Sequence, residues 1–170
     1  MKFNKSPESQ QDNYFSKKGE EEQISKLQEL QDCPEDPNRK LFKEKVKEQR
    51  IKEKNIPGSN IEIGFKREKL CLKALQELKK EEKIIDILPT GMIDVKGKFN
   101  ENPTNLDLHE QTDFLITVAS KGRIRFVKIS VKPPEAKTSL EKKADIFLNI
   151  GLDDTIEEIK EQIEKKLANI

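Results

Sequence analysis

An acidic and a basic residue stand at the outer ends of two strand-like runs in the middle of the chain. The runs, Phe114–Ala119 and Arg123–Lys132, are rich in β-branched and aromatic residues, and the turn Ser120-Lys121-Gly122 between them predicts a β-hairpin. Asp113 precedes the first run and Lys132 ends the second, so antiparallel pairing would bring both side chains to one edge of a sheet. A carboxylate beside an ammonium group is the minimum arrangement for binding a metal ion and a phosphate.

The composition limits how much of the chain can enter a core and which partners its overall charge can attract. Of 170 residues, 33% are apolar and 38% are charged, so we expect part of the chain to stay outside any core. The net charge of +1 provides no global attraction for nucleic acid, and a basic binding surface would have to be local. Cys33 and Cys71 have neither disulfide-framework nor zinc-site spacing, and the sequence has no signal peptide and no membrane-spanning stretch. We therefore expect a soluble, cytoplasmic protein that does not enter a membrane.

The first 57 residues are predicted to be a charged N-terminal extension, partly helical and partly disordered. A short helix is expected over 20–32 and a second, capped by Asn38, over 38–54. The second helix carries eight Lys and Arg residues against three Glu residues, so it would either contact phosphates or remain a solvated helix. A protein partner bound through these helices is a further alternative. The Pro- and Gly-containing segment 56–60 predicts the boundary with a domain over 58–170.

The domain reads as alternating helices and strands. Glu68 recurs at helical spacing with Cys71, Leu72, Leu75 and Leu78, which predicts a helix whose buried face includes one carboxylate. We expect strands over 84–88 and Ala144–Ile150, and an extension of the first strand or a second short strand over 92–95. A loop is expected over 96–105, and a short helix or loop after 134. The last element is a helix over 153–169, opened by the capping-box pair Thr155 and Glu158. This order predicts an α/β fold with a small mixed β-sheet flanked by helices.

Three segments together resemble the PD-(D/E)xK (restriction-endonuclease-like) nuclease superfamily over roughly residues 60–150. They are Gly64-Phe65-Lys66-Arg67-Glu68, Asp107–Asp113 with the strand after it, and Ile129-Ser130-Val131-Lys132-Pro133. The resemblance implies catalytic positions at Asp113, Ser130 and Lys132. It also implies that Asp113, Glu68 and the main-chain carbonyl of Val131 bind Mg²⁺ or Mn²⁺. Ser130 stands where the family usually has Glu or Gln, so one carboxylate is missing.

The resemblance implies a metal-dependent nuclease that hydrolyses phosphodiester bonds, with DNA favoured over RNA as the substrate. The alternative is a catalytically inactive α/β module that binds nucleic acid or a protein partner. Eight Lys and Arg residues against two Glu residues over 121–143 favour binding to a phosphate backbone, with Lys121, Arg123, Arg125 and Lys128 as the expected contacts. A solvated outer strand face is the equally simple alternative.

Three further residues receive structural interpretations. His109, the only histidine, is expected to lie exposed in a loop, because one histidine among carboxylates makes a poor zinc site. Asp107 is expected to be a turn residue; the alternative is a residue that supports the metal ligands from behind. Metal binding should be weakened by the carboxylate missing at 130 unless Glu68 or Asp107 compensates for it. Cys71 is expected to be a small buried hydrophobe.

Overall fold

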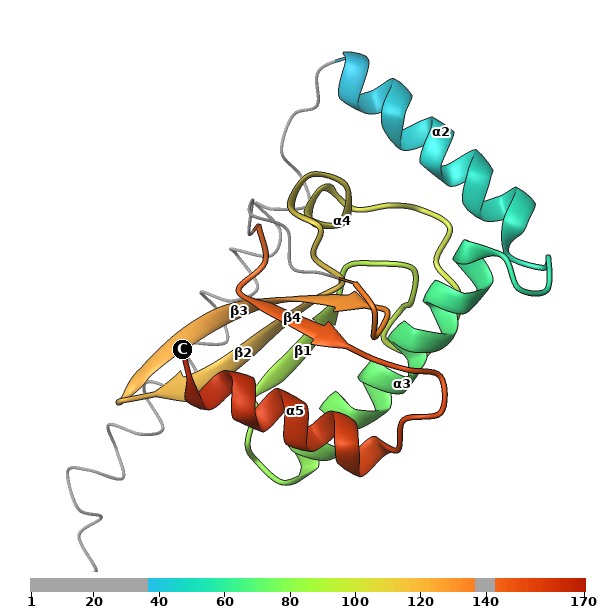
Figure 1. Ribbon diagram of the computed structural model, residues 1–170. Coiled ribbons are helices and arrows are strands. Elements are labelled where there is room, and N and C mark those ends of the chain that lie inside the picture. Colours follow the sequence, from blue (N-terminus) through green and yellow to red (C-terminus); the bar gives the residue numbers. More distant parts are fainter. Residues whose placement is uncertain (1–36, 137–142) are drawn as a thin grey trace, which may run out of the picture. The chain divides into compact units, whose positions relative to one another are not determined.

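Four strands form one mixed sheet in the computed structural model, which describes residues 37–136 and 143–170 (Figure 1). The strands β1 (Asp86–Pro89), β2 (Phe114–Ser120), β3 (Arg123–Lys132) and β4 (Ile146–Asn149) are neighbours in that order. The pairs β1–β2 and β2–β3 are antiparallel, and β3–β4 is parallel. Together with the helices α2 (Pro37–Glu53), α3 (Asn60–Lys80), α4 (Asn105–Glu110) and α5 (Ile156–Ala168), this confirms the predicted α/β class with a small mixed sheet flanked by helices.

The β2–β3 hairpin forms as its sequence predicts. Phe114 pairs with Ile129, and Ser120 pairs with Arg123 at the turn. Lys121 and Gly122 have φ values of 52° and 74°, which a two-residue hairpin turn of the primed type requires and which glycine adopts without strain.

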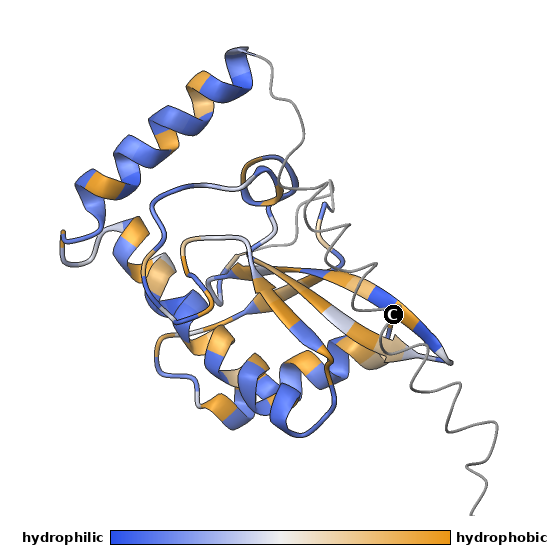
Figure 2. Ribbon diagram, turned by 180° about the vertical axis from the view of Figure 1, so that it is seen from behind, coloured by the Kyte–Doolittle hydropathy of each residue, from blue (hydrophilic) through white to orange (hydrophobic). Residues whose placement is uncertain are grey.

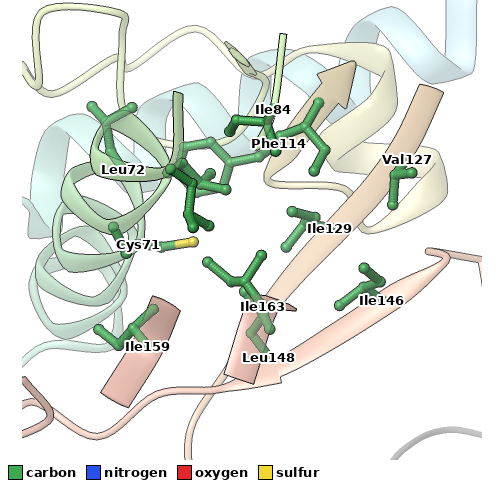
Figure 3. Close-up of a cluster of buried hydrophobic side chains, with 14 of the residues drawn as sticks. Cys71, Leu72, Ile84, Phe114, Val127, Ile129, Ile146, Leu148, Ile159 and Ile163 are labelled. Carbon is green, nitrogen blue, oxygen red and sulfur yellow. The ribbon is translucent and has the colours of Figure 1, made fainter. Parts of the chain in front are cut away.

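The helices α3 and α5 cover one face of the sheet and bury the core against it (Figure 1, Figure 3). On the sheet side, the core residues occupy alternate positions of the strands, including Phe114 and Ile116 on β2 and Ile129 on β3. Leu75 of α3 and Ile163 of α5 are completely buried among them. Viewed from behind, the apolar residues gather on the sheet and on the inner faces of these two helices, while the outer faces are hydrophilic (Figure 2).

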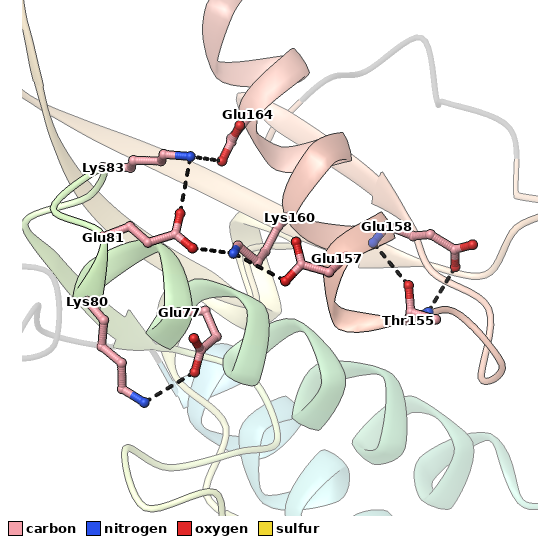
Figure 4. A network of polar contacts seen from close by, with 9 residues as sticks. All are labelled: Glu77, Lys80, Glu81, Lys83, Thr155, Glu157, Glu158, Lys160 and Glu164. Carbon is pink, nitrogen blue, oxygen red and sulfur yellow. Dashed lines mark hydrogen bonds and ion pairs between the residues drawn. The ribbon is translucent and has the colours of Figure 1, made fainter.

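The two helices that cover the sheet, α3 and α5, begin at side-chain caps. The Ser59 hydroxyl accepts a hydrogen bond from the Glu62 N–H at 3.1 Å and opens α3. Thr155 and Glu158 form the predicted capping box at the start of α5. An ion-pair network then ties the end of α3 to α5 (Figure 4): Lys83 lies 2.6 Å from Glu164, and the nearly buried Lys160 contacts Glu81.

The helix α2 belongs to the same compact unit as the sheet, although the sequence assigns residues 1–57 to a separate extension. It is anchored by Arg50, whose side chain is buried and forms an ion pair with Asp107 of α4. Its apolar residues Leu41, Phe42 and Ile51 are exposed. In the described ranges no helix has the length and apolarity needed to cross a membrane.

Three local expectations differ from the structure or lie outside it. The segment 92–95 contributes one isolated bridge, Ile93 to Phe99, in place of a strand. The segment around Asp107, expected to be a turn, is the helix α4, capped by Thr104. The helix expected over 20–32 and residues 137–142 after the hairpin lie outside the described residues.

Candidate functional site

A pocket of about 200 Å³ lies where the end of the sheet meets the first half of α3 and the helix α4. It is lined by Gly64, Arg67, Glu68, Met92, Asp107, Gln111, Asp113, Val131 and Lys132. Four of the residues selected from the sequence, Glu68, Asp113, Val131 and Lys132, therefore come together from two strands and a helix. Asp107 joins them as a third acidic residue.

Glu68 reaches this pocket from the buried face of α3 and is only 3% exposed. Its Oε2 atom accepts a hydrogen bond of 2.7 Å from the main-chain N–H of Met92. The neighbouring Gly91 explains how the chain approaches so closely: a Cβ atom there would lie 2.7 Å from Oε2 of Glu68 and 3.0 Å from Oδ1 of Asp113. The absence of a side chain at Gly91 therefore leaves room for two carboxyl groups.

Asp113 is held by main-chain hydrogen bonds to two neighbouring segments. Its N–H donates to the Ile129 carbonyl at 2.8 Å, and its carbonyl accepts from the Thr90 N–H at 2.8 Å and from the Gly91 N–H at 3.1 Å. Its Oδ2 atom accepts a hydrogen bond of 2.6 Å from the Val131 N–H. The side chain is consequently fixed at the junction of β1, β2 and β3.

Asp107 enters the pocket from α4. Its N–H donates to the Thr104 hydroxyl at 3.2 Å, and that hydroxyl donates to the Thr90 carbonyl at 2.6 Å, so the start of α4 is fixed to the end of β1. The Oδ2 atom of Asp107 accepts from Arg50 Nη2. In each of the three carboxyl groups, one oxygen is therefore held by a protein donor: Met92 N–H, Val131 N–H or Arg50.

The three carboxyl groups hold protons more tightly than they would in water. Burial, followed by the charges of Asp113 and Asp107, raises the pKa of Glu68 well above its ordinary value. Burial and then the Asp107 charge raise the pKa of Asp113 to about 7, against the opposing effect of the Val131 N–H. Burial also raises the pKa of Asp107, although Arg50 opposes this. A bound cation would offset the burial and, for Glu68 and Asp113, the neighbouring negative charges that raise these pKa values.

Lys132 lines the pocket and forms no ion pair with any described residue. Its positive charge nevertheless lowers the pKa of Asp113 and of Asp107, so it acts on the carboxyl groups through space. The simple alternative, a direct salt bridge between Lys132 and Asp113, is not present. The ammonium group therefore remains available for an anionic ligand.

Ser130 does not line the pocket, although the resemblance places it among the catalytic positions. Its side chain is completely buried, and its hydroxyl has no hydrogen-bond partner in the described part of the chain. Strand alternation puts it on the same face of β3 as Lys132, as expected. The residue shares the face of β3 with Lys132 but is not one of the residues that line the pocket.

The predicted nucleic-acid contacts divide into two groups. Lys121, Arg123 and Arg125 are exposed at the turn end of the hairpin. Arg125 and Arg123 lie roughly 23 and 30 Å from Lys132 along β3, at about 3.3 Å per strand residue. Arg123 and Arg125 also alternate onto the face of β3 opposite to Lys132. Lys128 shares the Lys132 face but pairs with Glu110 at 2.8 Å. The structure therefore does not gather these residues around the pocket.

The donor set of the pocket fits a hard divalent cation such as Mg²⁺. Glu68 and Asp113 supply carboxylate oxygens that converge beside Gly91, and alternation directs the Val131 carbonyl to the same side of β3 as the Ile129 carbonyl that binds Asp113. Within the described residues, no three His, Cys, Asp or Glu side chains form a group that could hold a metal ion by themselves. Two carboxylates with water ligands suffice for Mg²⁺, which dehydrates reluctantly.

The sequence predicts Asp107 as a turn residue, a support for the metal ligands or a substitute for the missing carboxylate, and it does not single out Arg50, the ion-pair partner of Asp107. Asp107 was expected in a turn, yet Thr104 three residues earlier gives the spacing of an N-cap with an acidic residue at the third helical position. Arg50 gave no signal, because it stands in a basic helix among other cations. His109, expected to be exposed in a loop, lies half-buried in α4, and its Nε2 atom is buried with no partner among the described residues.

No protein-family model matches this chain, and neither a curated protein nor a solved structure is detectably similar to it. The function must therefore be inferred from the chemistry of the pocket.

Proposed function

We propose that this protein is a nuclease-like hydrolase that cleaves phosphodiester bonds with Mg²⁺ or Mn²⁺ in the pocket at the end of the sheet. The observation that carries the proposal is the convergence of Glu68 from α3, Asp113 from the start of β2 and Lys132 from β3. They bring together two carboxyl groups and an ammonium group that forms no ion pair with a described residue. This combination serves a phosphodiester because the carboxylates bind the cation and the ammonium group binds a phosphate oxygen.

The residues have distinct tasks in this proposal. When bound, the cation would polarise the phosphate and lower the pKa of a water molecule. Glu68 and Asp113 would hold it in their ionised forms, with the Val131 carbonyl as a neutral ligand. The hydrogen bonds from Met92 N–H and Val131 N–H keep one oxygen of each carboxylate fixed, so the other oxygens are oriented before the ligand arrives. Lys132 would stabilise negative charge on the phosphate.

DNA is the first substrate to test and RNA the second, a preference that rests on the resemblance in sequence. Lys128 and Lys132 lie on one face of β3, so a backbone that crosses this face would contact both. Arg123 and Arg125, at the turn and on the opposite face, would add affinity only for a nucleic acid that wraps around the hairpin.

The second candidate function is a catalytically inactive module that binds nucleic acid or a protein partner. One specific observation favours it: Ser130 occupies the position of a usual carboxylate, and its buried hydroxyl does not replace that ligand. The exposed apolar residues Leu41 and Phe42 of α2 provide a surface for a protein partner in this case.

The experiment is a cleavage assay with the full-length chain on supercoiled plasmid, linear duplex, single-stranded DNA and single-stranded RNA, in Mg²⁺, Mn²⁺ or EDTA. We expect divalent-dependent cleavage by the wild type and by Asp153→Asn, an exposed control. Asp113→Asn and Glu68→Gln should each lower the rate of cleavage by at least about 100-fold, because each removes a charged ligand. Equal cleavage by the wild type and Asp113→Asn would exclude this site.

The same preparations separate the two candidates. Fluorescence anisotropy with labelled DNA measures binding in the presence and absence of Mg²⁺ and at several salt concentrations. Salt-sensitive binding without cleavage under any condition would support the inactive module and contradict hydrolysis.

A further inference from the structure

We propose that Arg67 of α3 binds the phosphate backbone of the nucleic acid together with Lys132, so that one phosphate group is held by two cations from α3 and β3. The inference deepens the proposed function and rests on its choice of a nucleic acid as the ligand. It gives a task to a residue that stands beside Glu68 in the sequence and to which the resemblance assigns none. It adds no metal ligand.

The guanidinium group of Arg67 lines the pocket and is fixed from one side. Its Nε atom donates a hydrogen bond of 3.1 Å to the carbonyl of Ile150, just after β4. A guanidinium group carries its N–H donors in a rigid planar fork, and this bond uses only the donor on Nε. The Nη1 and Nη2 atoms have no partner among the described residues, and neither atom is buried. The outer end of the fork is therefore open to two oxygens of one anion.

Ile150 connects Arg67 to Lys132. Its carbonyl accepts the hydrogen bond from Arg67, while its N–H donates a hydrogen bond of 2.8 Å to the Lys132 carbonyl. The side chain of Ile150 is completely buried in the core, so this link is rigid. The guanidinium of Arg67 and the main chain of Lys132 thus lie on the two sides of one residue. Since both side chains line the same pocket, both cations can reach the same phosphate group.

The acidic groups of the pocket leave these two cations without an ion pair. Asp107 pairs with Arg50, which does not line the pocket. Over the ranges 37–136 and 143–170, neither Arg67 nor Lys132 forms a salt bridge, although both share the pocket with three carboxyl groups. Two cations that stay unpaired beside available carboxyl groups favour an anionic ligand from outside the chain, and a phosphate of a nucleic acid backbone has that chemistry.

The alternative role of Arg67 is to attach α3 to the end of β4 through its one hydrogen bond. That role needs a single donor, whereas phosphate binding uses the charge and the fork together. Arg67→Gln keeps a donor and removes the charge. Arg67→Lys keeps the charge and a donor but has no fork, so the two variants together separate attachment from phosphate binding.

The test is fluorescence anisotropy of the full-length chain with a short labelled single-stranded DNA in EDTA, where no cleavage consumes the probe. We expect Arg67→Gln to weaken binding by at least about tenfold. It should also lower the slope of log affinity against log salt concentration by about 0.7, the value for one phosphate contact on a single strand. Arg67→Lys should keep most of that slope and lose affinity by at least about threefold, because its charge remains and its fork does not.

Lys80→Gln is the matched control. It removes one positive charge from the same helix, about 20 Å away from Arg67 at about 1.5 Å per residue, where Lys80 is exposed and pairs with Glu77. This variant should bind DNA as the wild type does. An equal loss of affinity in Lys80→Gln and Arg67→Gln would reduce the effect to overall charge and overturn the proposal.

The double variant Arg67→Gln/Lys132→Gln tests whether the two cations hold one phosphate. If they do, its loss of affinity should be smaller than the product of the two single losses, because either substitution already disrupts the shared contact. A loss equal to that product would place Arg67 and Lys132 on separate phosphates and overturn the shared site.

The outcomes also separate this inference from the proposed function. Wild-type affinity in both Arg67→Gln and Arg67→Lys, or no DNA binding by the wild type in EDTA, would overturn the inference, while cleavage in Mg²⁺ would still support hydrolysis. Binding that depends on Arg67, without cleavage in any divalent cation, would support the inference and contradict hydrolysis. Circular dichroism melts identify variants that fail to fold. If Arg67→Gln is one of them, Arg67→Lys decides the question, and wild-type affinity in that variant overturns the proposal.

Discussion

Raising the pH should lower the free energy of unfolding of the metal-free protein, because of the carboxyl pair formed by Glu68 and Asp113. Burial and the neighbouring charge of Asp107 raise the pKa of Asp113 from 3.8 to about 7 in the folded protein, so the folded state binds its proton more tightly than the unfolded chain does. The contribution is therefore fully present below about pH 4 and is lost as the pH rises toward 7.

The size of the loss follows from the two pKa values. The interval from 3.8 to about 7 corresponds to about 4 kcal/mol at 1.36 kcal/mol per pH unit. This is an upper bound, because Asp113 keeps partial contact with solvent. With an m-value of about 2 kcal/mol per molar urea, the midpoint of unfolding would move by at most about 2 M.

The assay is urea unfolding in EDTA at several pH values, for the wild type and for the double variant Glu68→Gln/Asp113→Asn. The difference between the two proteins isolates the pair, because carboxylates such as Glu81, whose pKa is lowered by Lys160, act with the opposite sign in both. We expect the wild type to lose stability relative to the double variant between about pH 4 and pH 7. The exposed control Asp153→Asn should follow the wild type at every pH.

The reasoning would be refuted if the difference in free energy of unfolding between the wild type and the double variant stayed constant with pH, or if it moved in favour of the wild type as the pH rises. Mg²⁺ added at the upper end of this range should stabilise the wild type more than the double variant, since the double variant lacks the ionisable side chains of Glu68 and Asp113.

The remaining predictions concern single positions. Gly91→Ala should lower the free energy of unfolding by about 1–3 kcal/mol, because its Cβ would overlap the carboxyl oxygens beside it; an unchanged urea midpoint would contradict this. Ser130→Ala should keep both cleavage and metal binding and be neutral or stabilising by up to about 2 kcal/mol, since it removes a buried hydroxyl without a partner among the described residues. A loss of cleavage in this variant would return Ser130 to the mechanism. Thr155→Ala should cost about 1 kcal/mol in urea unfolding, as the capping box of α5 loses its acceptor, whereas an equal loss in an Asp153→Asn control would assign the effect to the loop.

The hairpin and the helices α3 and α5 could be predicted because their signals are local. Alternating β-branched residues, the Lys-Gly turn and the cap at Thr155 determine structure within a few residues of themselves. The convergence of Asp113 with Lys132 followed from antiparallel pairing, since strand ends that pair must meet.

The misplaced residues depend on contacts that no local pattern encodes. Arg50 is separated from Asp107 by 57 positions, and nothing in a basic helix marks the one cation that becomes buried.

The placement of Arg123 and Arg125, in contrast, was predictable from the sequence, because each stands an odd number of residues from Lys132 and must lie on the other face of β3. Alternation along the strand decides which face a side chain lies on, whereas a local excess of basic residues does not.

The two main-chain donors of the pocket affect how the site responds to mutation. The N–H groups of Met92 and Val131 exist whatever side chain these positions carry, so substitutions at either position leave the donor in place. Only proline deletes it, since proline has no N–H. A saturation library at positions 92 and 131 should therefore tolerate many replacements at Met92, and at Val131 those that still fit the core, with proline as the variant lost at both.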